Sequence, residues 1–461
     1  MRKSLGLIFT LCGLMMLALG IKAEEIDLSE ISISANRMAT PLADVGSSVT
    51  VISQEEISNS SESYVIDFIT KVPGVHVSQN GPKGSTSGLT LRGLGLKYVK
   101  VLVDGIDIGD VSSIPVVANL SGLMLNEIDR IEILQGSQSA LYGSSAIGGV
   151  ISLTTKKAAR EKTSVSLEGG TYGTVSLDLG KTFSSENSDI RASGSYFSTE
   201  GFSAKAGGVE DDGYSSSRMS VTGTYYISDA ESLSISMFKK EENGDQDGYD
   251  PVSFEFVDKD DEVYTNDSLG FAANIEISSG NVVRNLELNF FNIDRFYTGP
   301  YNYEGTNLEL SWQEKRTLDD GFFIYGLVSD NERTSIEDVN KEINKSHIFS
   351  EYIFRDEDKF NFTLSGRTSG HSQFGGSSTA RVSASYKFTG GTILRSSIGS
   401  GYRAPSLFEL FAPYYGNSDL QPETSVTVDV GAEIPLADNK TSLYELRGIA
   451  RIIRSESFTA D

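Results

Sequence analysis

Cysteine and histidine are nearly absent from this 461-residue chain. Its one cysteine, Cys12, lies within the first hydrophobic segment, so a form that lacks this segment has no thiol. Disulfides and thiolate metal sites are therefore excluded from that form. The three histidines, His76, His347 and His371, are scattered along the sequence and are more typical of structural or surface positions than of haem ligands.

Basic residues and long hydrophobic runs are also scarce. Lys and Arg total 39 against 63 Asp and Glu, and the net charge of −24 argues against a nucleic-acid-binding protein, because a phosphate backbone would be repelled. After the N-terminus, no run approaches the roughly 20 apolar residues that a membrane-spanning helix needs. The 46 Gly, 20 Tyr and 23 Phe instead favour many exposed β-strands over a compact α/β enzyme.

Residues 1–23 are typical of a secretory signal peptide. Arg2 and Lys3 precede an apolar stretch from Leu5 to Leu19, and Ala23 is the small residue expected at a cleavage site. An N-terminal membrane anchor is the alternative, but the stretch is short and glycines interrupt it. We therefore expect export to the bacterial envelope.

Residues 24–157 have the mixed periodicity of a small α+β domain of about 130 residues. Ser53 is an N-cap candidate for a helix that begins at Gln54, and a second helical stretch covers residues 63–69. Short strands that alternate with glycine follow at 89–93, 99–105, 128–134 and 149–154.

After Arg160, hydrophobic residues alternate with polar or small ones in about fourteen segments, which turn-forming residues separate. A soluble β-sandwich or propeller also alternates, but these segments are long, end in aromatic residues and show no fixed repeat. With the signal peptide, they predict an outer-membrane β-barrel that has one face toward lipid and the other toward a polar lumen.

The order of the two regions predicts their arrangement. A folded domain joined closely to barrel strands indicates a plug inside the barrel, and enclosing a plug takes a barrel of about 22 strands. The residues after 160 suffice for about 14–15 strands, so we expect an incomplete barrel. Residues 440–461 also lose the alternation and favour a helical or frame-shifted interpretation. We hypothesise a C-terminally truncated product with two unpaired strand edges, which lipid would not tolerate.

Several motifs resemble those of the TonB-dependent outer-membrane receptor family. The resemblance implies an α+β plug domain at 41–157 and an antiparallel transmembrane β-barrel at 160–461, preceded by a periplasmic leader at 24–40. In the barrel it rests on residues 401–405, 407–410 and 416–423. In the plug it rests on Leu91, Arg92, Gly93, Asp104, Gly105, Arg130, Glu132, Gly136, Tyr142 and Gly143.

These plug residues are interpreted as structural. The four charged ones, Arg92, Asp104, Arg130 and Glu132, are more typical of polar groups satisfied inside a wet barrel than of ion pairs that gate it. The four glycines are expected in tight turns where a Cβ atom would clash.

The leader contains a segment that resembles the family's TonB box, Ser29-Glu30-Ile31-Ser32-Ile33-Ser34-Ala35. It is a short alternating strand without a nearby sequence partner, and such a strand can join the sheet of another protein through backbone hydrogen bonds. A disordered leader is the alternative. The resemblance implies that TonB, with its proton-driven inner-membrane complex, is the partner.

Within the family, the chain is most similar to the vitamin B12 (cobalamin) receptor branch. The similarity includes Pro73-Gly74-Val75 followed by Gln79 and Asn80, which are therefore the candidate ligand-binding residues. A ferric siderophore is the alternative ligand, because siderophore receptors share the scaffold. No histidine lies at 403–417, where the family's haem receptors carry one, so haem is not expected.

Cobalamin receptors use calcium to order extracellular loops, and two acidic loops of this chain offer oxygen ligands for a structural Ca²⁺. One acidic position of that branch is Ser203 here, and solvated loops facing lipopolysaccharide (LPS) are the alternative. No cofactor is otherwise required. The candidate Ca²⁺ ligands are Glu210, Asp212, Asp250 and Asp258.

The sequence thus predicts a non-enzymatic, monomeric receptor in the lipid of the outer membrane that takes up a scarce nutrient, cobalamin before a siderophore, by TonB-coupled transport. The nucleophile with a base, or the paired carboxylates, of a secreted hydrolase do not stand out. A secreted β-rich binding protein and a non-functional truncated product are the alternatives from other classes. No nucleic-acid partner is expected.

Overall fold

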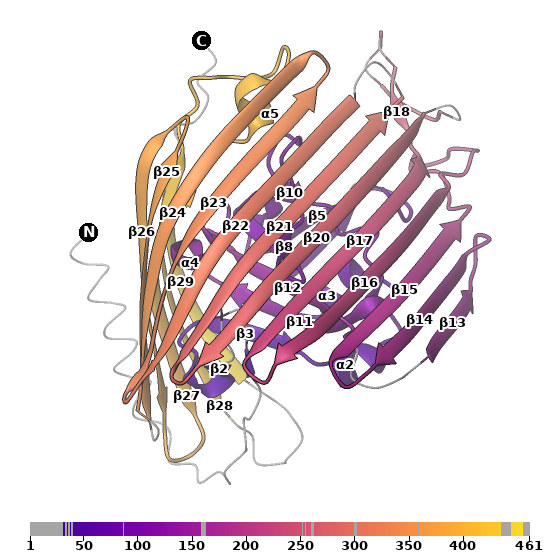
Figure 1. The fold of residues 1–461 in the computed structure, drawn as a ribbon. Coiled ribbons are helices and arrows are strands. Elements are labelled where there is room, and N and C mark those ends of the chain that lie inside the picture. Colours follow the sequence, from indigo (N-terminus) through magenta and orange to yellow (C-terminus); the bar gives the residue numbers. More distant parts are fainter. Residues whose placement is uncertain are drawn as a thin grey trace.

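The computed structural model describes residues 31–454 except 33–34, 36, 38–39, 86, 158–162, 251, 254, 260–261, 299–301, 357–358 and 435–443. The chain forms an N-terminal domain up to residue 157 and a large antiparallel sheet from Thr163 onward. Figure 1 shows that the sheet curves around the N-terminal domain. Among the described residues, the helices are all too short or too polar to cross a lipid bilayer.

A five-stranded sheet forms the centre of the N-terminal domain. β11 (Ile128–Gln135) pairs antiparallel with β3 (Ser48–Ile52) and β12 (Gly149–Thr155), whereas β12 pairs parallel with β7 (Val99–Val103), which β8 (Ile106–Asp107) follows. Its central strands are rich in Ile, Val and Leu, and the side chains of Ile131, Ile133, Ile151 and Leu153 have no exposed surface.

The helices of this domain are short and lie where the sequence predicts the first two. α2 (Gln54–Ser58) begins after Ser53, which forms a capping box with Glu56, and α3 (Val65–Ile69) follows. α4 (Ser139–Tyr142) is entirely buried. The smaller elements are β1 (Ile31–Ser32), β2 (Thr40–Pro41), η1 (Leu42–Asp44), β4 (Val75–Gln79), β5 (Ser87–Leu91), β6 (Leu94–Gly95), η2 (Leu96–Tyr98), β9 (Gly109–Asp110), β10 (Val117–Ala118) and η3 (Leu125–Glu127).

The large sheet has 15 strands, and each pairs with its neighbour in sequence order. The hairpin β18 (Gly248–Tyr249) and β19 (Phe256–Val257) and the helix α5 (Leu407–Phe411) lie in its connecting loops. The strands are β13 (Thr163–Gly169), β14 (Val175–Ser184), β15 (Ser188–Thr199), β16 (Tyr214–Ser228), β17 (Glu231–Asp245), β20 (Val263–Ser279), β21 (Val282–Tyr297), β22 (Asn302–Leu318), β23 (Gly321–Ile336), β24 (Val339–Arg355), β25 (Phe360–His371), β26 (Gly375–Lys387), β27 (Ile393–Arg403), β28 (Glu423–Ile434) and β29 (Tyr444–Arg454).

The fold class is confirmed, but the helical interpretation of the C-terminal segment is wrong for residues 444–454. Residues 444–454 form β29 in antiparallel register with β28, although their side-chain pattern favours a helix or a shifted frame. The backbone ladder with β28 satisfies the N–H and C=O groups of this strand whatever its side chains are. β13 and β29 end the strand order, so the sheet is open within the described residues.

The two faces of the large sheet reverse the usual distribution of a soluble protein. Polar side chains such as Arg218, Lys240 and Glu351 are buried on the face toward the N-terminal domain. Apolar side chains are exposed on the opposite face, among them Leu167, Met219, Leu327, Ile348 and Val426. An exposed apolar surface of this extent fits hydrocarbon better than water.

This outer face predicts how the protein responds to an added charge. Leu327 lies within β23 and is 51% exposed. We expect Leu327→Arg to lower the unfolding free energy in lipid vesicles by about 2–4 kcal/mol, because the guanidinium would enter hydrocarbon. The apolar control Leu327→Val should change it by less than about 1.5 kcal/mol. Urea unfolding measures both, and an arginine variant as stable as the wild type would place this face in water.

Candidate functional site

The segment that resembles a TonB box is partly buried. Its residues Ile31 and Ser32 form β1, which pairs antiparallel with β2. The Ser32 hydroxyl donates a 2.7 Å hydrogen bond to Glu132 and accepts one from the amide of Ala35. Ser32 and Ala35 have no exposed surface, so this end of the leader is tucked against the N-terminal domain. Ser29, Glu30, Ile33 and Ser34 lie outside the described residues.

Arg37 anchors the leader at a second point. Its guanidinium carbon lies 5.0 Å from the ring centroid of Tyr142 in α4 and 5.1 Å from that of Phe349 in β24. Both rings are buried, and a desolvated cation–π contact is worth on the order of 2 kcal/mol. One cation therefore contacts the leader's own domain and the sheet. The sequence analysis selected Tyr142 but missed Arg37 and Phe349, because their contact spans residues far apart in the chain.

Two of the charged motif residues bind the large sheet. Arg92 Nη1 lies 2.7 Å from Asp429 Oδ1 of β28. Asp104 accepts hydrogen bonds from the amide and hydroxyl of Thr155, at 2.8 and 2.6 Å, and from the Ser236 hydroxyl of β17 at 2.8 Å. These side chains therefore bind the N-terminal domain to β28, near one end of the strand order, and to β17, nearer the other end.

The other two charged motif residues bind each other. Arg130 Nε lies 2.8 Å from Glu132 Oε1, and the other oxygen of this buried carboxylate accepts the Ser32 hydroxyl. The Arg130–Glu132 pair therefore holds the leader. The sequence analysis missed further contacts between domain and sheet, notably Glu127 with Arg218 and Asp44 with Arg355.

Two of the four motif glycines are needed for different reasons than expected. A Cβ at Gly93 or Gly105 would meet no atom within 4 Å, so the expected clash is absent there, and the positive φ of 78° and 87° is what favours glycine. At Gly136, a Cβ would lie 2.6 Å from Asp429 Oδ2, and a Cβ at Gly143 would lie 3.0 Å from Nη2 of Arg367. At these two positions the expected close contact is present. Leu91 is a fully buried core residue.

The candidate ligand residues Gln79 and Asn80 are exposed at the end of β4. The Gln79 amide donates a 2.7 Å hydrogen bond to the carbonyl of Pro82, which braces the loop 80–85. The Tyr264 hydroxyl of β20 donates to the carbonyl of Gly84 in the same loop at 2.6 Å. This loop of the domain is therefore held against the sheet while Gln79 and Asn80 face solvent.

The structure brings together two of the four acidic candidates. Oxygen atoms of Glu210, Asp247 and Asp258 lie within 4.8 Å of one another. Within the described residues, both carboxylate oxygens of Glu210 are shielded from solvent and accept no hydrogen bond. Burial and the neighbouring carboxylates together raise the pKa of Glu210 to about 7. Unpaired, crowded oxygens of this kind fit a hard cation such as Ca²⁺.

The remaining acidic candidates are not among these three residues, although Asp212 lies close enough to raise the pKa of Glu210. Asp212 is buried and accepts a 2.6 Å hydrogen bond from the amide of Ala204, and burial raises the pKa of its carboxyl group. Asp250 lies in a local turn, where the amides of Val252 and Ser253 donate to it and lower its pKa. Asp247, which stands three residues before Asp250, was not a candidate; only the folding of the two loops together identifies it.

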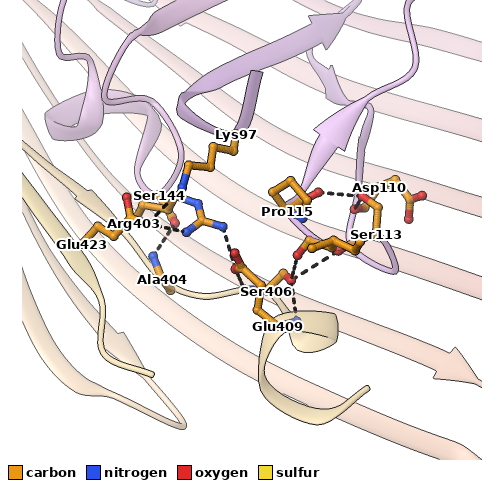
Figure 2. Close-up of polar contacts among 11 residues, drawn as sticks. Lys97, Asp110, Ser113, Pro115, Ser144, Arg403, Ala404, Ser406, Glu409 and Glu423 are labelled. Carbon is orange, nitrogen blue, oxygen red and sulfur yellow. Dashed lines mark hydrogen bonds and ion pairs between the residues drawn. The ribbon is translucent and has the colours of Figure 1, made fainter. Parts of the chain in front are cut away.

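The loop between β27 and β28 is held by a buried arginine (Figure 2). Arg403 donates to Glu409 at 2.6 Å and to Glu423 at 3.0 Å, and Lys97 of the N-terminal domain lies 3.3 Å from the same Glu423 oxygen. Arg403 is only 2% exposed, so the two carboxylates must compensate for the loss of water around its charge.

The same loop hydrogen-bonds to the backbone of the N-terminal domain. Ser406 caps α5, and its hydroxyl lies within hydrogen-bond distance of the carbonyls of Ser113 and Ile114 (Figure 2). The amide of Ala404 donates to the Ser144 hydroxyl at 3.1 Å. Barrel motif and N-terminal domain thus meet in one polar network, which we call the latch: Lys97, Ser113, Ile114, Ser144, Arg403, Ala404, Ser406, Glu409 and Glu423.

The latch predicts the effect of removing its central charge. Arg403→Gln removes the cation that pairs with Glu409 and leaves Glu423 with only the partly exposed Lys97, and breaking a buried ion pair costs about 3–5 kcal/mol. We therefore expect the loop to detach. Maleimide labelling of Ala412→Cys, which is 6% exposed in the loop, should be slow alone and at least tenfold faster with Arg403→Gln.

A matched control removes a neighbouring exposed charge. Lys341 lies over the ring of Phe411 in α5 but is exposed, so Lys341→Gln should leave the labelling rate near that of the parent. Equal labelling rates for the Arg403 and Lys341 variants would show that the ion pairs do not hold the loop.

Comparison with known proteins agrees with this architecture. Residues 41–150 match the TonB-dependent receptor plug domain, and residues 158–446 match the TonB-dependent receptor-like β-barrel. The siderophore receptor PirA from Pseudomonas aeruginosa is similar in structure, with a TM-score of 0.68 and 18% identity over 84% of this chain and 72% of PirA.

Two further receptors share the fold. The ferric enterobactin receptor PfeA of P. aeruginosa has a TM-score of 0.72 and 16% identity over 84% of this chain and 70% of PfeA. The ferric yersiniabactin uptake receptor FyuA from Yersinia pestis has a TM-score of 0.68 and 16% identity over 89% of this chain and 72% of FyuA. The two sequence matches cover most of the chain, and they agree with an N-terminal domain enclosed by a sheet whose outer face is apolar. The chain therefore belongs to the TonB-dependent receptor family.

Proposed function

We propose that this receptor captures a small-molecule nutrient at the outer face of the bacterial outer membrane and passes it inward by TonB-coupled transport. The apolar outer face of the sheet supports the membrane location. The observation that carries the proposal is the tucked leader, which Ser32 holds through one hydrogen bond and Arg37 through two cation–π contacts. Receptors of this family catalyse no reaction.

The tucked leader suggests how ligand and energy are coupled. A released leader strand can add to the sheet of TonB through backbone hydrogen bonds, and TonB supplies energy that the outer membrane itself lacks. Ligand binding then only has to shift the leader from tucked to available, which takes a few kcal/mol. A cavity of about 50 Å³ between plug and sheet is lined by both Arg37 and Ser406, so the leader and the latch border the same space.

We favour a ferric siderophore as the ligand. The similar structures PirA, PfeA and FyuA are all siderophore receptors by name, and aromatic and arginine side chains line the loop end of the sheet. Cobalamin is the second candidate, supported by the resemblance around Gln79 and Asn80 and by the acidic group in the loops.

Deleting residues 29–35 tests the proposed transport. We expect the deletion to abolish uptake and to leave ligand binding unchanged, because Ile31 and Ser32 contact β2 and Glu132 and not the candidate ligand residues Gln79 and Asn80. Uptake of labelled ligand by cells and equilibrium binding to purified protein measure the two separately. Arg37→Ala, which removes the cation–π contacts with Tyr142 and Phe349, should keep uptake and increase crosslinking of the leader to TonB. Normal uptake by the deletion variant would refute TonB coupling.

We also propose that Glu210, Asp247 and Asp258 bind Ca²⁺. Glu210→Gln should weaken Ca²⁺ binding roughly tenfold or more, because it removes a charged ligand from the group. Asp250→Asn removes one carboxylate from the neighbouring turn and should leave the affinity unchanged. Isothermal titration with CaCl₂ compares them, and equal affinities of the two variants would contradict the site.

A further inference from the structure

The outer face of the large sheet carries a shielded carboxylate near one end of its strands. Glu314 of β22 is only 5% exposed, although the alternation along this strand places it on the same face as the exposed Leu308 and Leu310. The turns nearest to it, 280–281 and 319–320, have two residues each, whereas the longer loops 200–213 and 404–422 lie at the opposite end of the strands. Short turns face the periplasm in barrels of this class, so Glu314 lies near the periplasmic edge of the outer face.

Two arginines share this carboxylate. Arg284 Nε of β21 lies 2.8 Å from Glu314 Oε2, and Arg316 Nε of β22 lies 2.7 Å from Oε1. The Tyr325 hydroxyl of β23 donates a 2.7 Å hydrogen bond to Oε1. The strand register explains these contacts, because Arg284 and Tyr325 both stand opposite Glu314. Two positive charges and one negative charge leave the group with a net charge of +1.

The positive charge of this group is exposed and the negative charge is hidden. The side chains of Arg284 and Arg316 are 42% and 50% exposed, and among the described residues neither has a second carboxylate partner. Glu314 lies beneath them. A molecule that approaches the outer face therefore meets guanidinium N–H donors and not the carboxylate. Guanidinium groups bind phosphate through such paired donors.

Aromatic and apolar side chains border the group on the side toward the middle of the sheet. The ring centroid of Trp312 lies 5.8 Å from that of Tyr325. Trp312 stands opposite Leu286 of β21 and Leu327 of β23, which are both exposed on the outer face. Tryptophan and tyrosine gather where lipid headgroups meet hydrocarbon. The two arginines therefore lie at the level of lipid phosphates, next to side chains that suit acyl chains.

We propose that Arg284 and Arg316 bind the phosphate of an anionic phospholipid in the periplasmic leaflet of the membrane. Glu314 is the positioning residue, because its two oxygens hold the two guanidinium groups side by side. A phosphodiester carries one negative charge, which matches the net charge of the group. This inference rests on the membrane location in the proposed function and is independent of the transported ligand.

Another arginine on the same face lacks these properties and is a matched control. Arg333 of β23 lies 3.2 Å from Glu342 of β24, toward the loop end of the strands. The side chains are 63% and 43% exposed, so one cation meets one anion and both are accessible. This pair has no net charge to attract a phosphate.

Trp312 is the only tryptophan of the chain and reports on lipid beside the site. Brominated acyl chains quench tryptophan fluorescence on contact. With the full chain in phosphatidylcholine vesicles, we expect brominated phosphatidylglycerol to bind about fivefold more strongly than brominated phosphatidylcholine, which corresponds to about 1 kcal/mol. Arg284→Gln and Arg316→Gln should each abolish this preference, and each leaves Glu314 paired with one arginine. Arg333→Gln should keep it.

Three results would overturn the site: equal binding of the two lipids by the wild type, the same preference in the Arg284 and Arg316 variants, or an equal loss in Arg333→Gln. Displacement of brominated phosphatidylglycerol by excess inorganic phosphate would show that a free anion occupies the site and would overturn the lipid assignment. Quenching by brominated phosphatidylcholine and circular dichroism confirm that each variant is inserted and folded.

The proposed function fails by different results. A wild type that no brominated lipid quenches would refute the membrane location, and the lipid site with it. Uptake that survives deletion of residues 29–35 would refute TonB coupling and leave the lipid site standing.

Discussion

Buried charge on the inner face of the large sheet is the constraint on which the rest of the structure depends. Burying a charge without a partner costs several kcal/mol, and the inner face carries Arg218, Arg395 and Asp429, among others. The plug supplies Glu127 for Arg218 and Arg92 for Asp429, and it adds the carbonyls of Leu42 and Val45 to Arg395, which also pairs with Glu433 of β28. The plug therefore fills the space that the sheet encloses and also stabilises buried charges on its inner face.

The apolar centre of the plug and the polar contacts between the plug and the sheet differ in how much free energy it costs to break them. The apolar cluster around Ile131 and Ile151 lies mostly within the plug and continues onto Phe197, Phe238 and Phe291 of the sheet, so opening it would expose hydrocarbon to water. Many of the contacts with the sheet are hydrogen bonds and ion pairs, which exchange for water or for a ligand at a much smaller net cost. Releasing the leader or the latch is therefore expected to cost less than opening the apolar centre of the plug.

Much of the fold and the family membership could be predicted from local patterns. Ser53 and Glu56 form the capping box that starts α2, and the period of two after Arg160 becomes a single antiparallel sheet. The predicted site was recovered unevenly. Glu210 and Asp258 lie together, but Asp250 stands in another turn and Asp247 takes part in its place. The contacts of Arg37 with Tyr142 and Phe349 and the ion pair of Asp44 with Arg355 were missed, because each joins residues more than 100 positions apart and no spacing rule connects them.

By itself, the sequence determined which face each residue of the sheet takes, where the plug begins its helices and which motifs the chain shares with its family. These depend on interactions within a few residues, or on a period that the backbone geometry imposes. Only the tertiary structure decided which charged side chains of the plug pair with which charged side chains of the sheet. It also decided that residues 444–454 form a strand despite their pattern, because pairing with β28 satisfies the backbone regardless of the side chains. Partner choice inside the barrel depends on where distant strands and plug loops come to lie, and no local rule carries that information.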